Sequence, residues 1–132
     1  MGGSSGYICR ACGTRFIARG GGGFRFDQLH CDACGVDRSV GHDELGDIHL
    51  RYVKGLPGPY AVSRWASDAR IQRDYPGEPL SEEAYHAAVE ATLGPCACGG
   101  RFRYDAPSRC PECRSTAESW DVDMDIAGML YD

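Results

Sequence analysis

The sequence has few basic residues and little that suggests a large enzyme. Its 132 residues contain 14 lysines and arginines against 19 acidic residues, and Lys54 is the only lysine. General nucleic-acid binding depends on clustered Lys and Arg that neutralise phosphates, so the composition disfavours it. The length also excludes scaffolds such as the eightfold strand–helix barrel. These deficits leave one ordinary domain or two very small ones.

Long apolar runs are also missing. The longest are only a few residues, so we expect no segment that spans a bilayer. Residues 1–6 carry neither a basic region nor an apolar stretch, so they do not read as a signal peptide. We expect residues 1–6 to be a flexible N-terminal linker or tag remnant.

No cysteine is left unpaired in the sequence. The eight cysteines form four close pairs, which are Cys9 and Cys12, Cys31 and Cys34, Cys96 and Cys98, and Cys110 and Cys113. A tight turn with two cysteines supplies two of the four soft ligands that tetrahedral zinc requires. Because the first two pairs are 18 residues apart and the last two are 11 apart, we expect neighbouring pairs to combine. The sequence therefore predicts two structural Zn²⁺ sites, each with four cysteine ligands.

Two other uses of the cysteines are a disulfide framework and redox or iron chemistry. A disulfide inside a C-x-x-C turn closes too small a loop to stabilise much, which favours metal. Metal-bound thiolates indicate a reducing compartment, so we expect a cytoplasmic location. A catalytic zinc keeps an open ligand position, whereas two complete four-cysteine sets have none, so we expect no enzyme and no catalytic residues.

The residues that follow the cysteine pairs are similar to those of a known superfamily of metal-binding modules. Gly13, Gly35 and Gly99 follow three pairs, where a glycine can adopt positive φ while amides turn towards the thiolates; the fourth pair is followed by Arg114. The stretches "YICRACGTRFIARGGGGFRFDQLHCDACG" and "CACGGRFRYDAPSRCPECRS" resemble the zinc-ribbon superfamily, in a double arrangement. The resemblance implies β-hairpins with knuckle sites. Cys110-Pro-Glu-Cys113 is also similar to a rubredoxin knuckle, which implies iron in the same ligand set.

The predicted fold is a small metal-stabilised α+β chain, with two zinc ribbons flanking a short two-helix insert. The first ribbon spans 7–40, with strands over 14–18 and 24–29 joined by a glycine turn. The second spans 95–132, with a hairpin over 101–104 and 108–110. It ends in an acidic strand, 120–126, whose apolar face carries Trp120, Val122, Met124 and Ile126.

The insert over 41–94 lacks cysteine. We predict a strand over 48–53 and helices over 59–73 and 81–93, the last with Ser81 as N-cap. Trp65 and Trp120 each lie on an apolar stripe, so we expect both in the core rather than at an interface. His30 is expected either to support a neighbouring metal site or to lie on the surface, rather than to ligate. The stretch from His42 to His49 has no metal-binding spacing.

The preferred function is a non-enzymatic double zinc-ribbon adaptor or regulator that binds a protein partner. Residues 115–132 carry a net charge of −5, whereas 7–40 and 95–114 each carry +2, so opposite electrostatic faces are available. The first alternative is a transcription- or RNA-associated ribbon that contacts nucleic acid through Arg10, Arg15, Arg19 and Arg25. The second alternative is a rubredoxin-like iron protein for electron transfer.

Overall fold

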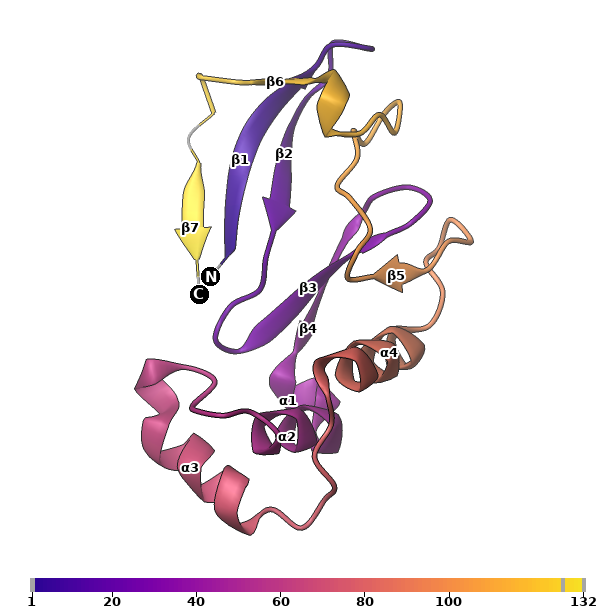
Figure 1. Ribbon diagram of the computed structural model, residues 1–132. Helices are drawn as coiled ribbons and strands as arrows, with labels where there is room; N and C mark the ends of the chain where they lie inside the picture. Colours follow the sequence, from indigo (N-terminus) through magenta and orange to yellow (C-terminus); the bar gives the residue numbers. More distant parts are fainter. Residues whose placement is uncertain (1, 127, 132) are drawn as a thin grey trace. The chain divides into compact units, whose positions relative to one another are not determined.

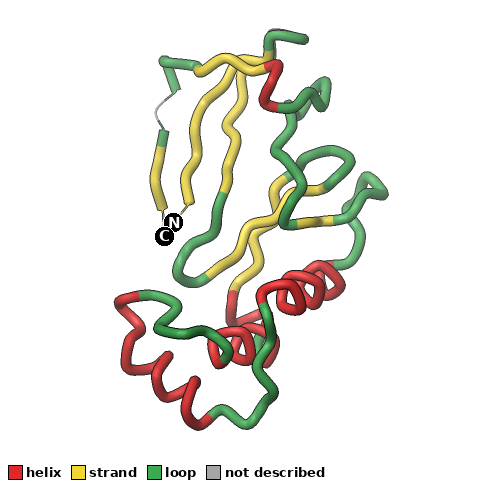
Figure 2. Tube along the Cα trace, viewed as in Figure 1, coloured by secondary structure: helices red, strands yellow, loops and turns green. Residues whose placement is uncertain are grey.

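The computed structural model describes residues 2–126 and 128–131, which form two compact units (Figures 1 and 2). The first unit comprises Met1–Ser39 and Gly94–Asp132, and the second comprises Val40–Leu93. Apart from Val40, the ranges expected for the two ribbons thus lie in one unit. The fold is a small α+β arrangement with two antiparallel sheets in the first unit and the helices in the second, as far as the chain is described.

The central strand of the first sheet is β1 (Gly2–Cys9), most of which we expected to be a linker. On one edge β1 pairs with β2 (Arg15–Gly20). On its other edge it pairs with β6 (Trp120–Val122) near Cys9 and with β7 (Met129–Tyr131) near its start (Figure 1). Residues 2–6 are therefore structural, because strands on both sides satisfy their backbone groups.

The glycines of β1 allow close packing, although the Gly/Ser composition of this segment suggested a linker. A Cβ placed on Gly6 would overlap the side chain of Ile126, and one on Gly3 would lie 3.2 Å from Leu130 Cδ2. Glycine within a strand marks such close approach. The Gly/Ser stretch thus allows the C-terminal segment to lie directly on the backbone of β1.

The second sheet places β3 (Phe26–Cys31) between β4 (Asp37–Gly41) and β5 (Phe102–Arg103). The predicted hairpin between the strands over 14–18 and 24–29 is wrong, because β2 and β3 belong to different sheets. Residues 108–110, which the structure describes, form no strand, so the predicted second hairpin is also wrong. Strand β5 pairs with β3 rather than with that segment. The two N-terminal knuckle turns, at Cys9–Cys12 and Cys31–Cys34, rather than the glycine-rich loop, connect neighbouring strands.

The C-terminal strand is shorter than expected, and the predicted alternation of buried and exposed side chains fails after Trp120. It ends at Val122, the side chain of Met124 is 87% exposed, and Asp123 is buried. Arg15 stabilises the Asp123 carboxylate with two hydrogen bonds, from Nε to Oδ2 at 2.6 Å and from Nη2 to Oδ1 at 3.0 Å. A bidentate guanidinium offsets much of the cost of burying a charge, which alternation of apolar residues does not reveal.

An aromatic cluster fills the core beside this sheet. Trp120 packs against Tyr7 and Phe16, with ring centroids 5.0 and 4.9 Å away respectively. The three rings lie against the buried residues Cys9 and Cys110. The expectation that Trp120 belongs to the core is confirmed.

The second unit contains the helices α1 (His42–Leu45), α2 (Asp47–Lys54), α3 (Trp65–Asp74) and α4 (Glu82–Leu93), and the short 3-10 turn η1 (Val62–Arg64). The predicted strand over 48–53 is wrong, because this segment is α2 and buries His49 and Val53 at helical spacing. The expectation that Trp65 lies in the core is also wrong, because Trp65 is 66% exposed. None of the helices described is long and apolar enough to cross a membrane.

Two polar contacts organise these helices. The backbone N–H of Ala84 donates to Ser81 Oγ at 3.2 Å, so the predicted N-cap of α4 is confirmed. Asp68 of α3 is fully buried and accepts hydrogen bonds from the backbone N–H groups of Tyr60 and Ala61, at 2.8 and 3.4 Å. Arg64 lies 3.6 Å from its other oxygen. Asp68 therefore fixes the loop before α3.

Replacing Asp68 with alanine is expected to destabilise the second unit by about 3–5 kcal/mol, because it leaves buried donors without their acceptor. Urea unfolding followed by circular dichroism measures this change. Asp74→Ala removes an exposed carboxylate from the same helix and is the matched control. Equal losses in the two variants would contradict the role given to Asp68.

The Arg15–Asp123 pair predicts a defined acid response. Hydrogen bonds from Arg15 hold the pKa of the Asp123 carboxyl below its ordinary value. Its stabilisation is therefore complete above the unfolded-state pKa, about 3.9, and disappears as pH falls through the lower folded-state pKa. We expect Asp123→Asn to lower the thermal midpoint at neutral pH, with a difference from wild type that shrinks below pH of about 4. Exposed Asp121→Asn should show little change at any pH.

Candidate metal centres

All four cysteine pairs lie at tight turns. The first cysteine of each pair donates its backbone N–H back across the turn, and the acceptor carbonyls belong to Thr14, Val36, Gly100 and Ser115, at 2.9, 2.9, 2.7 and 2.9 Å. In this geometry the residue after the second cysteine turns the chain. Each pair thus forms a knuckle that closes its own hairpin or loop.

Left-handed backbone at these turns confirms the role assigned to the glycines. The φ angles are 78° at Gly13, 77° at Gly35 and 95° at Gly99. Arg114 occupies the equivalent place in the fourth knuckle with φ of 65°, and it is the only non-glycine residue with positive φ in the described chain. A side chain there is conformationally unfavourable, so the turn is held by its surroundings.

The structure assembles the knuckles in crossed order. Centre A consists of Cys9, Cys12, Cys110 and Cys113, and centre B consists of Cys31, Cys34, Cys96 and Cys98. The expectation that neighbouring pairs combine, 9–12 with 31–34 and 96–98 with 110–113, is wrong. All eight predicted residues nevertheless fall into two groups of four that could each hold a metal ion.

Strand pairing explains this crossing. In β1 and β6, Cys9 lies opposite Trp120, and the Arg10 N–H donates to the Ser119 carbonyl at 2.6 Å. In β3 and β5, Cys31 lies opposite Phe102. Each N-terminal knuckle is therefore brought to a C-terminal one by a ladder between segments that are distant in sequence, a non-local pairing that spacing alone does not encode.

The sulfur positions fit a tetrahedral ion. Zinc–sulfur bonds of about 2.3 Å place the sulfurs of a regular tetrahedron about 3.8 Å apart. In centre A the Sγ atoms of Cys9 and Cys113 are 3.4 Å apart. In centre B those of Cys34 and Cys96 are 3.8 Å apart, and within each centre all four lie within 4.8 Å of one another. No cysteine forms a disulfide.

The thiols of centre B differ in acidity. Burial raises the pKa of Cys31, but the backbone N–H groups of Cys34 and Ala33 point at its sulfur, at 3.5 and 3.4 Å, and the pKa is lowered to about 6. Burial raises the pKa of Cys34 to about 12. At neutral pH the cluster therefore holds a thiolate beside thiols, and binding of a cation releases the remaining protons.

Centre A shows the same contrast. The pKa of Cys113 is lowered to about 6, first by the Ser115 hydroxyl, whose oxygen lies 3.0 Å from its sulfur. The Thr14 hydroxyl, 3.1 Å from Cys12 Sγ, lowers the pKa of that thiol. Burial raises the pKa of Cys110. Hydroxyl groups two residues after the second cysteine of these knuckles thus favour the metal-binding thiolate form.

Asp32 is a supporting residue that the sequence reasoning missed. Its Oδ1 accepts the Arg101 N–H at 2.9 Å, and its Oδ2 accepts from Arg103 Nε at 3.1 Å. Asp32 therefore ties the knuckle at Cys31 to β5, which carries the partner knuckle. Its place between two cysteines, where aspartate often accepts local backbone N–H groups, was an available signal.

The remaining residues singled out in the sequence have varied positions. His30 is buried outside both clusters, with Nε2 2.8 Å from the Arg19 carbonyl and 2.9 Å from Ser108 Oγ. The rings of His42 and His49 are buried and stacked with centroids 3.7 Å apart, but among the described residues they belong to no cluster of metal-binding groups.

The four arginines considered for nucleic acid do not form a free basic patch. Arg10 lies 3.7 Å from an Asp121 oxygen, and Arg15 binds Asp123 and Asp125. Arg19 lies 3.7 Å from Asp37. Arg25 is exposed. Three of the four thus have a carboxylate within the same chain.

Metal content of double variants tests the crossed assembly. We expect Cys9→Ser with Cys110→Ser to lose one of two metal ions, since both residues belong to centre A. Cys9→Ser with Cys31→Ser should lose both. Elemental analysis of purified proteins measures the stoichiometry. The opposite result, with loss of both ions in the first variant and one in the second, would restore the pairing of neighbouring knuckles.

Comparisons with known proteins define the family without adding a function. No curated protein matches the chain significantly, and no solved structure does so. One family covers most of the chain, residues 6–119, and therefore includes all eight cysteines and the second unit. The chain belongs to that family, which is described as "Domain of unknown function (DUF8255)".

Proposed function

We propose that this chain is a non-enzymatic adaptor or regulator, in which two zinc ions hold a double zinc-ribbon-like unit that binds a protein partner. The four-sulfur ligand sets and the short Sγ distances support zinc as the ion. Each set is complete, so a bound ion would have no open position for a substrate. The metal then has a structural role, and its thiolates are unavailable as nucleophiles.

A group of exposed apolar side chains carries the proposal of a protein partner. Val122, Met124, Met129 and Leu130 are 64%, 87%, 65% and 79% exposed. They lie in and between β6 and β7, which both pair with β1. Several large apolar side chains exposed along one edge of a sheet are unfavourable in water and typically mark an interaction site. A sheet held by centre A would present these side chains with little loss of conformational entropy on binding.

The nucleic-acid alternative is less well supported. The arginines it needs are largely paired with carboxylates, and the chain as a whole carries a net charge of −5. Phosphate binding would have to break these pairs and overcome the repulsion of an acidic protein. The iron alternative uses the same cysteines, and the Cys-Pro-x-Cys knuckle in centre A is the observation that favours it.

Partner capture tests the proposal directly. Tagged holo-protein should retain a protein partner from native lysate, and the partner should be lost from Val122→Asp, which places a charge on the exposed apolar group. Arg70→Gln, an exposed change in the second unit, is the control. The Cys9→Ser and Cys110→Ser double variant should also lose the partner. Capture that all variants retain equally would contradict the proposal.

Two measurements on purified protein separate the alternatives. We expect no binding of short RNA or DNA at low salt, where electrostatic binding is strongest. Affinity that falls linearly with the logarithm of salt concentration would replace the adaptor with a nucleic-acid ribbon. Colourless protein with two zinc ions per chain is expected, whereas visible iron–thiolate absorbance would indicate an electron-transfer protein.

A further inference from the structure

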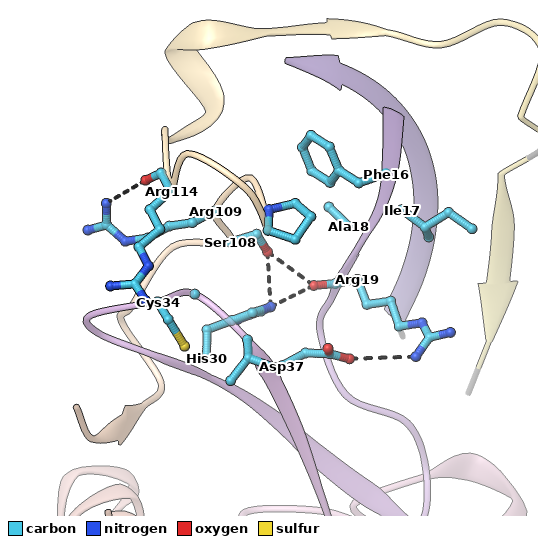
Figure 3. A pocket seen from close by; sticks show the side chains of 13 residues that line it. Phe16, Ile17, Ala18, Arg19, His30, Cys34, Asp37, Ser108, Arg109 and Arg114 are labelled. Carbon is cyan, nitrogen blue, oxygen red and sulfur yellow. Dashed lines mark hydrogen bonds and ion pairs between the residues drawn. The ribbon is translucent and has the colours of Figure 1, made fainter. Parts of the chain in front are cut away.

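A pocket of about 280 Å³ lies within the first unit, beside β2 and between the two centres (Figure 3). The residues around it come from β2, from the knuckle of centre B and from the segment leading into the last knuckle of centre A. Phe16, Ala18, Val36 and Pro111 contribute apolar atoms. In Figure 3, Phe16 and Ala18 lie on the side of β2 that faces Ser108, and Ile17 lies on the other.

The backbone of β2 is an open edge along this pocket. In the ladder order β2-β1-β6, β2 is terminal, and Gly6 lies opposite Ile17. The Gly6 carbonyl accepts from the Asp123 N–H at 3.0 Å, so it points away from β2. Residues opposite each other in an antiparallel pair either exchange both bonds or neither, and the N–H and C=O of Ile17 therefore point away from β1.

At the far end of this edge the backbone carbonyl already has hydrogen-bond partners. The Arg19 carbonyl, two residues along and thus on the same side, lies 2.8 Å from His30 Nε2 and 3.3 Å from Ser108 Oγ. In the described chain no partner for the Ile17 N–H and C=O is found outside the sheet. One donor and one acceptor are therefore left beside apolar side chains, where an added strand of short length could use them.

Charge at the pocket favours an acidic occupant. Three arginines and Asp37 line it, and Arg19 lies 3.7 Å from the Asp37 carboxylate. Arg109 donates from Nη1 to the Arg114 carbonyl at 3.1 Å, which holds the chain at this turn. The exposed Arg114 guanidinium is left without a carboxylate partner among the described residues. A carboxylate could pair with it in bidentate fashion.

We propose that this pocket binds a short extended peptide segment of a partner protein, with an apolar side chain beside an acidic one. The proposal rests on the adaptor function above and specifies its partner's chemistry. One peptide residue bonds through its backbone with the N–H and C=O of Ile17. Its apolar side chain enters between Phe16 and Val36, and a neighbouring carboxylate pairs with Arg114.

Other ligands fit these features less well. A phosphate would use the guanidinium groups but leave the apolar lining and the open strand edge unused. Nucleic acid would add many phosphates to a protein of net charge −5. With a metal ion bound, the thiolates of centre B, of which Cys34 lines the pocket, offset the long-range potential of the arginines. Recognition therefore relies on short-range contact of one carboxylate rather than on general attraction of anions.

A peptide titration tests this site with the metal-loaded full chain. The probe is a short capped peptide in which glutamate and valine alternate, followed by amide chemical shifts in ¹⁵N-labelled protein. We expect saturable shifts at Ile17 and Val36. Affinity should fall about tenfold or more when glutamine replaces glutamate, because the negative charge and one acceptor oxygen are lost. It should fall similarly when the central valine is N-methylated, because a backbone N–H donor is lost. A short uridine RNA should not compete.

Matched variants locate the binding. Arg114→Gln and Val36→Asp should each weaken the peptide about tenfold or more, whereas Arg70→Gln and Val122→Asp should not. Elemental analysis confirms that each variant keeps its metal. Absence of peptide binding, equal binding to all variants, or tighter binding of the RNA would overturn the proposal. Because Val122→Asp tests the exposed apolar group and Val36→Asp tests the pocket, failure of this site and failure of the adaptor function give different patterns.

Discussion

Convergence of four cysteine sulfurs from opposite ends of the chain, in a group that could hold a metal ion, is the constraint on which the first unit depends. Cys12 and Cys110 are 98 positions apart, yet their sulfurs are separated by 3.6 Å. Closing so long a loop has a large entropic cost, and the two-residue strand β5 and the three-residue strand β6 contribute few backbone bonds to offset it. A structural zinc ion bound by these sulfurs would supply roughly 10–16 kcal/mol of apparent binding free energy, which is comparable with the whole stability of a small domain.

The core beside the first sheet is continuous with centre A. The aromatic cluster of Tyr7, Phe16 and Trp120 packs directly on Cys9 and Cys110 of centre A, so the candidate metal site and the core share one interior. A Cβ on Gly35 would overlap Arg109, which shows how closely the knuckle of centre B approaches the segment entering centre A. The two centres are thus parts of one packed unit, and the pocket beside β2 lies in the space that this packing leaves.

The sequence predicted the features that are local in the chain. The knuckles, their left-handed glycines, the N-cap at Ser81 and the helix α4 follow from residues only a few positions apart. Local spacing did not predict which knuckles combine, because four cysteine pairs can combine in more than one way and strand pairing decides among them. For the same reason the sequence did not predict strand β1. Gly6 leaves room for the side chain of Ile126, which is distant in the sequence. Asp123 is buried because Arg15 accompanies it, and alternation of apolar residues carried no sign of that pair.

Substitution of both ions with ¹¹³Cd would identify the ligands of each centre most directly, since three-bond couplings link the metal nucleus to the β-protons of its own cysteines. Crossed assembly predicts that one cadmium resonance correlates with Cys9, Cys12, Cys110 and Cys113, and that the other correlates with Cys31, Cys34, Cys96 and Cys98. A resonance that correlates with Cys9, Cys12, Cys31 and Cys34 would contradict the account, because the metal would then join neighbouring knuckles and not the two ends of the chain.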